Sequence, residues 1–189
     1  MTKPFDPHAG KQRLLHLVRE RAYRDGLDIT LASGKKSTFY INGKKVSLHP
    51  EGLWLIARLM LDALQRFPGI TAVGGLTLGA DPIASAIAAL SHETGQNYSA
   101  FLVRKEAKGH GTGSRIEGDL EKGQRVAIVE DTVTTGGSAM KAVEALKDAG
   151  YEKLGVTWIA DENPASLRQM QRMNAEPLHR LHLFRKAFA

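Results

Sequence analysis

The chain has no cysteine, which excludes disulfide bonds, thiolate zinc sites, iron–sulfur clusters and cysteine nucleophiles. Aromatic residues make up only 6% of its 189 residues, and no apolar run approaches the roughly 20 residues that a membrane-spanning helix needs. The first ten residues contain no apolar core of the kind found in secretory signal peptides. These absences favour a protein of the reducing cytoplasm, and we expect no membrane partner.

The composition that remains is that of a globular protein, with 42% hydrophobic and 24% charged residues. A length of 189 residues, without repeats or a linker-like tract, predicts a single domain over residues 1–189. The net charge of +6 indicates an anionic partner, which is either nucleic acid or a phosphorylated small molecule. The basic residues are scattered, and no helix-turn-helix or zinc-finger pattern is present, so we do not expect a nucleic-acid partner.

Strand-like and helix-like segments alternate along the chain. Apolar residues at helical spacing predict a helix over residues 8–24 and a second one that begins at Pro50. Two short strand-like runs fill residues 27–42 around a turn at 33–36. Further helices are expected at 82–90, 137–149 and 165–173, and further strands at 70–73, 98–103, 125–129, 153–160 and 178–184. This order predicts an α/β fold with a mainly parallel central sheet flanked by helices.

Ligands of such sheets bind at the carboxyl ends of the strands, which directs attention to loops 74–82, 104–118 and 130–138. The strongest local pattern is an apolar strand, residues 126–129, that runs into two adjacent carboxylates, Glu130 and Asp131. A turn rich in Thr, Gly and Ser follows and opens a helix, so it offers hydroxyls, backbone N–H groups and a helix N-terminus to an anion. Carboxylates repel phosphate but suit vicinal hydroxyls, and the combination therefore predicts a ribose-phosphate site. Neither a P-loop nor a dinucleotide-binding fingerprint is present.

Residues 126–138 resemble the 5-phosphoribosyl 1-diphosphate (PRPP) motif of the type I phosphoribosyltransferases. Residues 104–111, Arg-Lys-Glu-Ala-Lys-Gly-His-Gly, resemble the mobile catalytic loop of the orotate phosphoribosyltransferases, and residues 31–42 and 73–82 agree with that family. The resemblance runs in order over about residues 10 to 160. It implies the type I phosphoribosyltransferase fold, in which about residues 1–50 and the C-terminal segment form a small hood.

The implied activity is transfer of the phosphoribosyl group from PRPP to orotate, which gives orotidine 5′-monophosphate and diphosphate on the route to UMP. Negative charge builds on the departing diphosphate, and cations on a loop that closes stabilise that charge. His110 has the pKa range of a proton donor. The residues that the resemblance implies to be catalytic are Lys105, Lys108, His110 and Asp131.

The resemblance also assigns binding roles. The residues implied to bind PRPP are Arg104, Glu130, Asp131, Thr132, Val133, Thr134, Thr135, Gly136, Gly137 and Ser138. The turn implied to meet the diphosphate contains Gly75, Leu76, Thr77 and Gly79, and the residues implied to bind orotate are Tyr40, Ile41 and Thr135. The implied cofactor is Mg²⁺, a hard cation that we expect on substrate oxygens and water, without a dedicated protein ligand. A homodimer that shares the mobile loop between its subunits is implied as well.

Three positions depart from the usual family pattern. Ala32 and Gly79 stand where many members have lysine, and Lys35, Lys36, Lys44 or Lys45 are candidates to replace the missing charge. Asp161-Glu162 stands where the family often has Asp-Arg. Because Glu162 would repel the orotate carboxylate, a phosphoribosyltransferase for another nucleobase is an alternative. A regulator that senses PRPP and binds nucleic acid is a second alternative, although it would not need the cations of loop 104–111.

Overall fold

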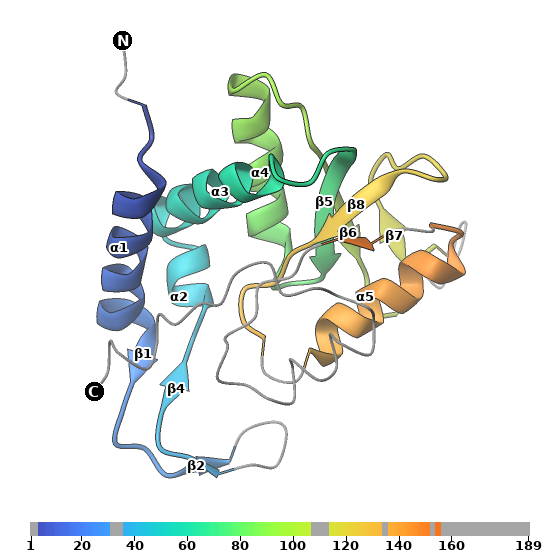
Figure 1. Ribbon diagram of the computed structural model, residues 1–189. Helices are drawn as coiled ribbons and strands as arrows, with labels where there is room; N and C mark the ends of the chain where they lie inside the picture. The colour runs from blue at the N-terminus through green and yellow to red at the C-terminus, as the bar shows by residue number, and fades with distance from the viewer. Residues whose placement is uncertain (1–3, 31–35, 107–113, 134–135, 152–153, 156–189) are drawn as a thin grey trace.

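The computed structural model describes residues 4–30, 36–106, 114–133, 136–151 and 154–155. A five-stranded sheet forms its centre, in the order β7-β6-β5-β8-β9 (Figure 1). The strands are β5 (Ile70–Leu76), β6 (Ser99–Val103), β7 (Ile116–Glu117), β8 (Arg125–Ile128) and β9 (Leu154–Gly155). β5 pairs in parallel with β6 and β8, β8 pairs in parallel with β9, and only β7 among these strands runs antiparallel to its neighbour. The predicted α/β fold with a mainly parallel sheet is confirmed.

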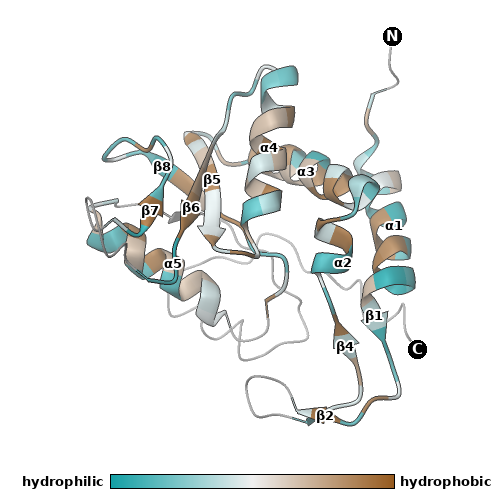
Figure 2. Ribbon diagram, turned by 180° about the vertical axis from the view of Figure 1, so that it is seen from behind, coloured by the Kyte–Doolittle hydropathy of each residue, from teal (hydrophilic) through white to brown (hydrophobic). Residues whose placement is uncertain are grey.

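Helices cover both faces of the sheet. On one face lie α3 (Pro50–Leu64) and α4 (Asp81–Glu93), and on the other lies α5 (Gly137–Asp148) (Figure 1). Side chains of β8 alternate between these layers: Val126 and Ile128 join the core under α5, while Ala127 joins the core under α3 and α4. A strand buried on both faces is apolar at every position, which is why residues 126–129 read as an unbroken apolar run. Figure 2 shows hydrophobic segments along the central strands and along α3.

The first predicted helix ends earlier than expected. Asp6 accepts a hydrogen bond from the backbone N–H of His8 and so caps α1 (Pro7–Leu17), which continues as the π-helix η1 (Val18–Ala22). Tyr23 then turns to an extended backbone, with φ −80° and ψ 137°, and pairs with Ile41. Cross-strand pairing therefore overrides the helical spacing at the last two positions of the predicted segment.

Short hairpins and one short helix link η1 to α3. β1 (Tyr23–Arg24) pairs with β4 (Tyr40–Ile41), β2 (Ile29–Thr30) pairs with β3 (Lys36–Ser37), and α2 (Lys44–Ser47) follows. The two strand-like runs predicted in residues 27–42 are thus present, but the second run contributes to both pairs. The Tyr23 and Phe39 rings lie 5.9 Å apart and fasten β1 to the segment that leads into β4. In Figures 1 and 2 these hairpins extend away from the central sheet.

Several boundaries differ from the sequence prediction. β5 runs on through Gly74 and Gly75, where we placed its end, because only glycine lets that strand lie against β6: a Cβ at Gly74 would collide with the Phe101 carbonyl. β7 lies in a segment where we expected no strand, since two residues are too short to show periodicity. Gly150, with φ +85°, follows α5 in the left-handed conformation typical of a glycine just after a helix. The helix expected at 165–173, the strand expected at 178–184 and the C-terminal part of the hood lie outside the described residues.

No helix within the described ranges is long and apolar enough to cross a bilayer.

Candidate functional site

The parallel strands β6, β5 and β8 lie side by side, and the loops that follow them therefore meet at one edge of the sheet. The Thr77 amide donates to the Val103 carbonyl at 2.9 Å, and the Val129 amide donates to the Gly74 carbonyl at 2.8 Å. The first hydrogen bond ties the turn after β5 to the end of β6, and the second ties β5 itself to the residue before Glu130. The structure thus brings together three segments that the sequence analysis selected, namely the diphosphate turn, the start of the cationic loop and the acidic pair.

The acidic pair is buried directly beneath the turn after β5. Glu130 is 8% exposed, and the side chain of Asp131 is 7% exposed. A Cβ placed on Gly79 would collide with Oε1 of Glu130 and would stand 2.7 Å from Oδ1 of Asp131. The turn thus lies against the two carboxylates at the position where residue 79 has no side chain. A side chain at position 79 would require the ends of the Glu130 and Asp131 side chains to shift.

Asp131 influences the ionisation of its neighbour Glu130. Burial, together with a hydrogen bond to Asp131, raises the pKa of Glu130 to about 7, and the nearby Lys44 opposes that rise. Lys44 Nζ donates a hydrogen bond to Oδ2 of Asp131 at 2.8 Å, which raises the lysine's own pKa. The site therefore holds a carboxyl group that changes charge near neutral pH, beside a carboxylate paired with a cation.

The turn after the acidic pair has the backbone of an anion site. Gly136, with φ +78°, precedes α5 in a left-handed conformation, and no side chain among the described residues caps that helix. The first N–H groups of an uncapped helix N-terminus are available to an anion. Thr132 and Ser138 are exposed, Val133 and Gly137 are half-buried, and Gly136 is buried. Thr134 and Thr135 lie outside the described residues.

The loop after β6 leaves from a fixed base. The backbone of Arg104 pairs with that of Arg115 at 2.7 Å, and the Arg115 guanidinium donates to the carbonyl oxygens of Arg104 and Lys105, both at 3.3 Å. The Arg104 guanidinium donates to the Glu117 carboxylate at 2.8 Å. Lys105 is exposed at this base. Lys108 and His110 lie outside the described residues, so their predicted place in the site stays a prediction.

The predicted diphosphate turn divides into buried and accessible parts. Leu76 is 5% exposed and belongs to the core under α5, and a Cβ on Gly75 would collide with the Val129 carbonyl. Thr77 is half-buried, Leu78 is 73% exposed, and the peptide bond between them is cis. Gly75 and Leu76 can therefore offer a ligand only their backbone groups. The following residues, 77–79, form a turn that lies over the carboxylates of Glu130 and Asp131.

The predicted orotate residues lie on β4, near the lysine that reaches the acidic pair. Tyr40 is 46% exposed, and its proximity contributes to the raised pKa of Lys44. Ile41 is half-buried. Of the lysines considered as replacement cations, Lys36 pairs with Asp28 at 3.2 Å and Lys45 has no partner among the described residues. Lys35 lies outside those residues, so Lys44 is the described candidate that reaches the site.

Sequence reasoning missed two features of the site. The first is the contact between Gly43 and the phosphate turn: a Cβ on Gly43 would collide with Oγ1 of Thr132 and lie 2.9 Å from the Asp131 carbonyl. The second is Asp81, whose Oδ1 is buried without a hydrogen-bond partner among the described residues and whose pKa is raised by that burial. Gly43 belongs to no recognised motif, and no local signal would have found its contact across the chain. Asp81 lies within residues 73–82, which the sequence analysis did select, but its buried oxygen is visible only in the structure.

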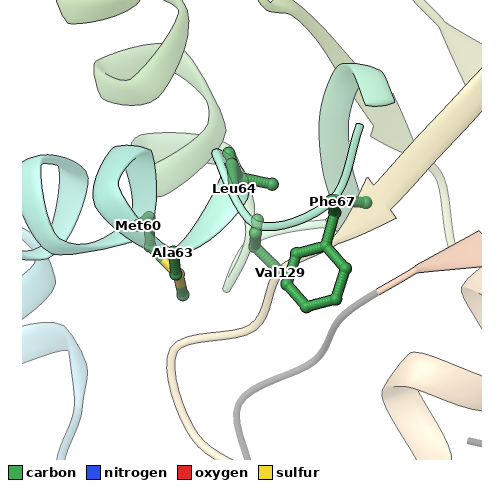
Figure 3. A pocket seen from close by; sticks show the side chains of 6 residues that line it. Met60, Ala63, Leu64, Phe67 and Val129 are labelled. Atoms are coloured by element: carbon green, nitrogen blue, oxygen red, sulfur yellow. The ribbon is translucent and has the colours of Figure 1, made fainter. Parts of the chain in front are cut away.

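A pocket on the α3 side of the sheet does not suit a charged substrate. It is lined by apolar residues only: Met60, Ala63, Leu64, Phe67, Ala127 and Val129 (Figure 3). It offers no donor to a phosphate, which therefore has better partners at the α5 N-terminus. In the part of the chain that the structure describes, no group of three or more His, Cys, Asp or Glu side chains could hold a metal ion.

Known proteins resemble the chain in sequence and in structure. No protein-family model matches it. It is 53% identical over 150 residues to an orotate phosphoribosyltransferase of Thermosynechococcus vestitus, which covers 77% of this chain and 78% of the relative. The orotate phosphoribosyltransferase of Mycobacterium tuberculosis H37Rv, solved with Fe(III) dicitrate, superposes with a TM-score of 0.74 at 40% identity, covering 88% of this chain and 93% of that one. The same enzyme solved with PRPP gives a TM-score of 0.69 at 36% identity, with 88% and 92% covered.

Proposed function

The chain belongs to the orotate phosphoribosyltransferase family, and on that premise we propose that it makes orotidine 5′-monophosphate and diphosphate from orotate and PRPP. The reaction is a step of pyrimidine biosynthesis that leads to UMP. The 53% identity with a relative of that name carries the proposal. The buried acidic pair beside a helix N-terminus that no described side chain caps supports it, because carboxylates suit the ribose hydroxyls and a helix N-terminus suits the phosphate.

PRPP is proposed to bind across the three strand ends. Glu130 and Asp131 accept hydrogen bonds from the ribose hydroxyls, and the turn from Thr132 to Ser138 surrounds the 5-phosphate with N–H groups and hydroxyls. The diphosphate then meets the turn at 77–79, where Gly79 lets the backbone approach. The Mycobacterium tuberculosis relative, solved with PRPP, supports this substrate.

Catalysis is proposed to depend on charge stabilisation at the leaving diphosphate. As the bond between ribose C1 and the diphosphate breaks, negative charge builds on the diphosphate and positive charge on the ribose ring. Arg104, Lys105, Lys108 and His110 face the first charge, and the ionised Asp131 favours the second. Orotate is placed by Tyr40, Ile41 and Thr135. Its ring nitrogen forms the new bond to C1 and gives up its proton, which the departing diphosphate or water accepts.

Mg²⁺ is proposed to enter with PRPP, on the diphosphate and ribose oxygens. The described residues contain no acidic or histidine cluster suited to a resident metal, and Mg²⁺ prefers oxygen and water ligands. When bound, the ion neutralises part of the diphosphate charge. No protein side chain is assigned to it.

The molecule is proposed to act in the cytoplasm as a homodimer that shares the loop at 104–111 between its subunits. We further propose that residues 1–189 make one domain, to which about residues 1–50 and the C-terminal segment contribute a hood. A gel-filtration mass twice the 20.6 kDa of the chain would support the dimer, and a mass equal to it would contradict it.

The direct test is loss of orotate absorbance when the purified protein meets PRPP, Mg²⁺ and orotate, with uracil and hypoxanthine in parallel reactions. We expect orotate consumption that requires both PRPP and Mg²⁺. Consumption of another base alone would keep the PRPP site and reassign the substrate. PRPP binding without turnover of any base would instead favour the sensor alternative, which salt-dependent DNA or RNA binding would then test.

A further inference from the structure

Helix α2 presents a cation to the acidic pair from a distant part of the sequence. Lys44 is the first residue of this helix, and its Nζ lies 2.8 Å from Oδ2 of Asp131. The two partners differ in exposure: the lysine side chain is 50% exposed, whereas that of Asp131 is 7% exposed. Ion pairs between two exposed groups contribute little, but a pair whose acceptor is buried is screened less by solvent.

The position of Lys44 is built into the packing around α2. Gly43 lies so close to Thr132 and to the Asp131 carbonyl that no Cβ fits there. On the other side of α2, a Cβ on Gly52 would collide with the Val46 carbonyl, and Val46 itself is 2% exposed. Two close backbone approaches thus hold α2 between the start of α3 and the phosphate turn. Lys44 therefore reaches Asp131 from a fixed base.

The two oxygens of Asp131 have different neighbours. Oδ2 accepts from Lys44, while Oδ1 faces Gly79 in the turn after β5. Glu130 also faces Gly79. Among the described residues, Lys44 is the cation that acts on the two carboxyl groups, and Tyr40 lies close enough to Lys44 to influence the pKa of the lysine. Without a cation, two buried carboxyl groups in contact retain a proton between them more strongly. The raised pKa of Glu130 fits this principle, because Glu130 keeps its proton to a higher pH than an isolated carboxyl group does.

We propose that Lys44 is a positioning residue for PRPP: it holds the Asp131 carboxylate oriented so that this carboxylate accepts a hydrogen bond from a ribose hydroxyl. The inference rests on the proposed function for the identity of the ligand. It also gives Lys44 a different role from that of a replacement cation for Ala32 or Gly79. A replacement cation would act on the diphosphate, whereas Lys44 acts on the ribose through Asp131.

The difference can be measured with the two halves of the substrate. Ribose 5-phosphate carries the hydroxyls and the 5-phosphate, and inorganic diphosphate carries the leaving group. We would titrate each by calorimetry into the wild-type protein, Lys44→Ala and Lys44→Arg. Lys45→Ala serves as a matched control, because it removes the same charge one residue along and has no partner among the described residues.

We expect Lys44→Ala to weaken ribose 5-phosphate binding by about 10- to 100-fold, the loss typical of a hydrogen bond to a charged group. Diphosphate binding should stay within a factor of about two, Lys44→Arg should restore part of the affinity, and Lys45→Ala should bind as the wild type does. In turnover, Lys44→Ala should raise KM for PRPP and move the acidic limb of the kcat/KM profile to higher pH. A purely structural role would lower the melting temperature without moving that limb.

Two results would overturn the inference. One is unchanged ribose 5-phosphate affinity in Lys44→Ala at an unchanged melting temperature. The other is a selective loss of diphosphate affinity, which would make Lys44 a cation for the leaving group. The binding assay needs no nucleobase, so the failure of the proposed function is distinguishable: a wild-type protein that ignores orotate but shows the ribose 5-phosphate difference would retain the role of Lys44 with another acceptor.

Discussion

Lys44 and Asp131 stand 87 positions apart in the chain, and 2.8 Å separates Nζ of the lysine from Oδ2 of the aspartate. The N-terminal hairpin region is thereby joined to the phosphate motif at the carboxylate that we assign to the ribose. Gly43 brings the two backbones into contact beside that ion pair. A substitution of either residue should therefore change the affinity of the protein for PRPP.

Lys105→Ala should lower kcat by about 10²-fold, because we propose that its charge stabilises the leaving diphosphate. Lys105 is exposed at the base of the loop, so the melting temperature should not change. Steady-state kinetics with saturating orotate measure the effect, with the exposed Lys122→Ala as control. A near-normal kcat in Lys105→Ala would remove Lys105 from the catalytic groups.

Asp131→Asn should lower kcat/KM for PRPP by about 10²-fold or more while the protein stays folded. The amide keeps the shape of the side chain but loses the charge that pairs with Lys44 and that we propose to accept from the ribose. Circular dichroism checks the fold and initial rates check the turnover. The exposed Asp119→Asn removes the same charge away from the site, and equal kinetics in the two variants would show that the acidic pair is misassigned.

The contribution of Glu130 to stability should fall as pH rises from about 4.5 to about 7. Burial raises the pKa of Glu130 from 4.5 to about 7, so the folded protein binds more protons than the unfolded chain in that window. The contribution is fully present below pH 4.5 and is lost as pH rises through 7, with an upper limit of roughly 3 kcal/mol. Urea unfolding at several pH values measures it, and the wild type minus Glu130→Gln difference isolates it. A difference independent of pH would contradict the shift.

Gly79→Ala should destabilise the protein by roughly 1–3 kcal/mol, as overpacking of a tight site does. Its Cβ would collide with Oε1 of Glu130 and press on Oδ1 of Asp131, so PRPP affinity should fall as well. A double-mutant cycle with Glu130→Ala is the check: the cost of Gly79→Ala should be smaller where the Glu130 carboxylate is absent. Additive costs would mean that the turn does not rest on that carboxylate.

Tyr40→Ala should raise KM for orotate by about 10-fold or more and leave KM for PRPP nearly unchanged. An aromatic ring stacked on a base contributes roughly 1–3 kcal/mol, and Tyr40 presents an exposed ring on β4. Tyr40→Phe keeps the ring and should recover most of the orotate affinity. An equal rise of both KM values in Tyr40→Ala would point to damage of the hairpin instead.

The central sheet was predictable because its signal is local. Buried parallel strands are continuous apolar runs, and the runs at 98–103 and 125–129 correspond to β6 and β8 within one or two residues. The acidic pair was predictable for the same reason, since it follows directly on an apolar strand. The loss of two helical residues at Tyr23 and Arg24 was not, because their partners in β4 are some 17 positions away.

The surroundings of the acidic pair depend on contacts between distant segments. Lys44 was one of four lysines that could have reached the site, and only the packing of Gly43 on Thr132 selects it. Gly79 looked like a missing cation in the sequence, whereas in the structure it is the residue that lets the turn meet two carboxylates. A single sequence shows which residue stands at a motif position, but only the three-dimensional structure shows which atoms a larger side chain would meet there.

The antiparallel strand β7 gives the loop after β6 two anchors on adjacent strands. Val103 pairs with Ile116 and Leu102 with Glu117, so the loop leaves and re-enters the sheet between neighbouring strands, about 5 Å apart. Loop closure cost grows slowly with length once both ends are fixed. This position is therefore suited to grafting: loops of other lengths or sequences, exchanged between Lys105 and Ser114, should change turnover while leaving the sheet and the ribose site as they are.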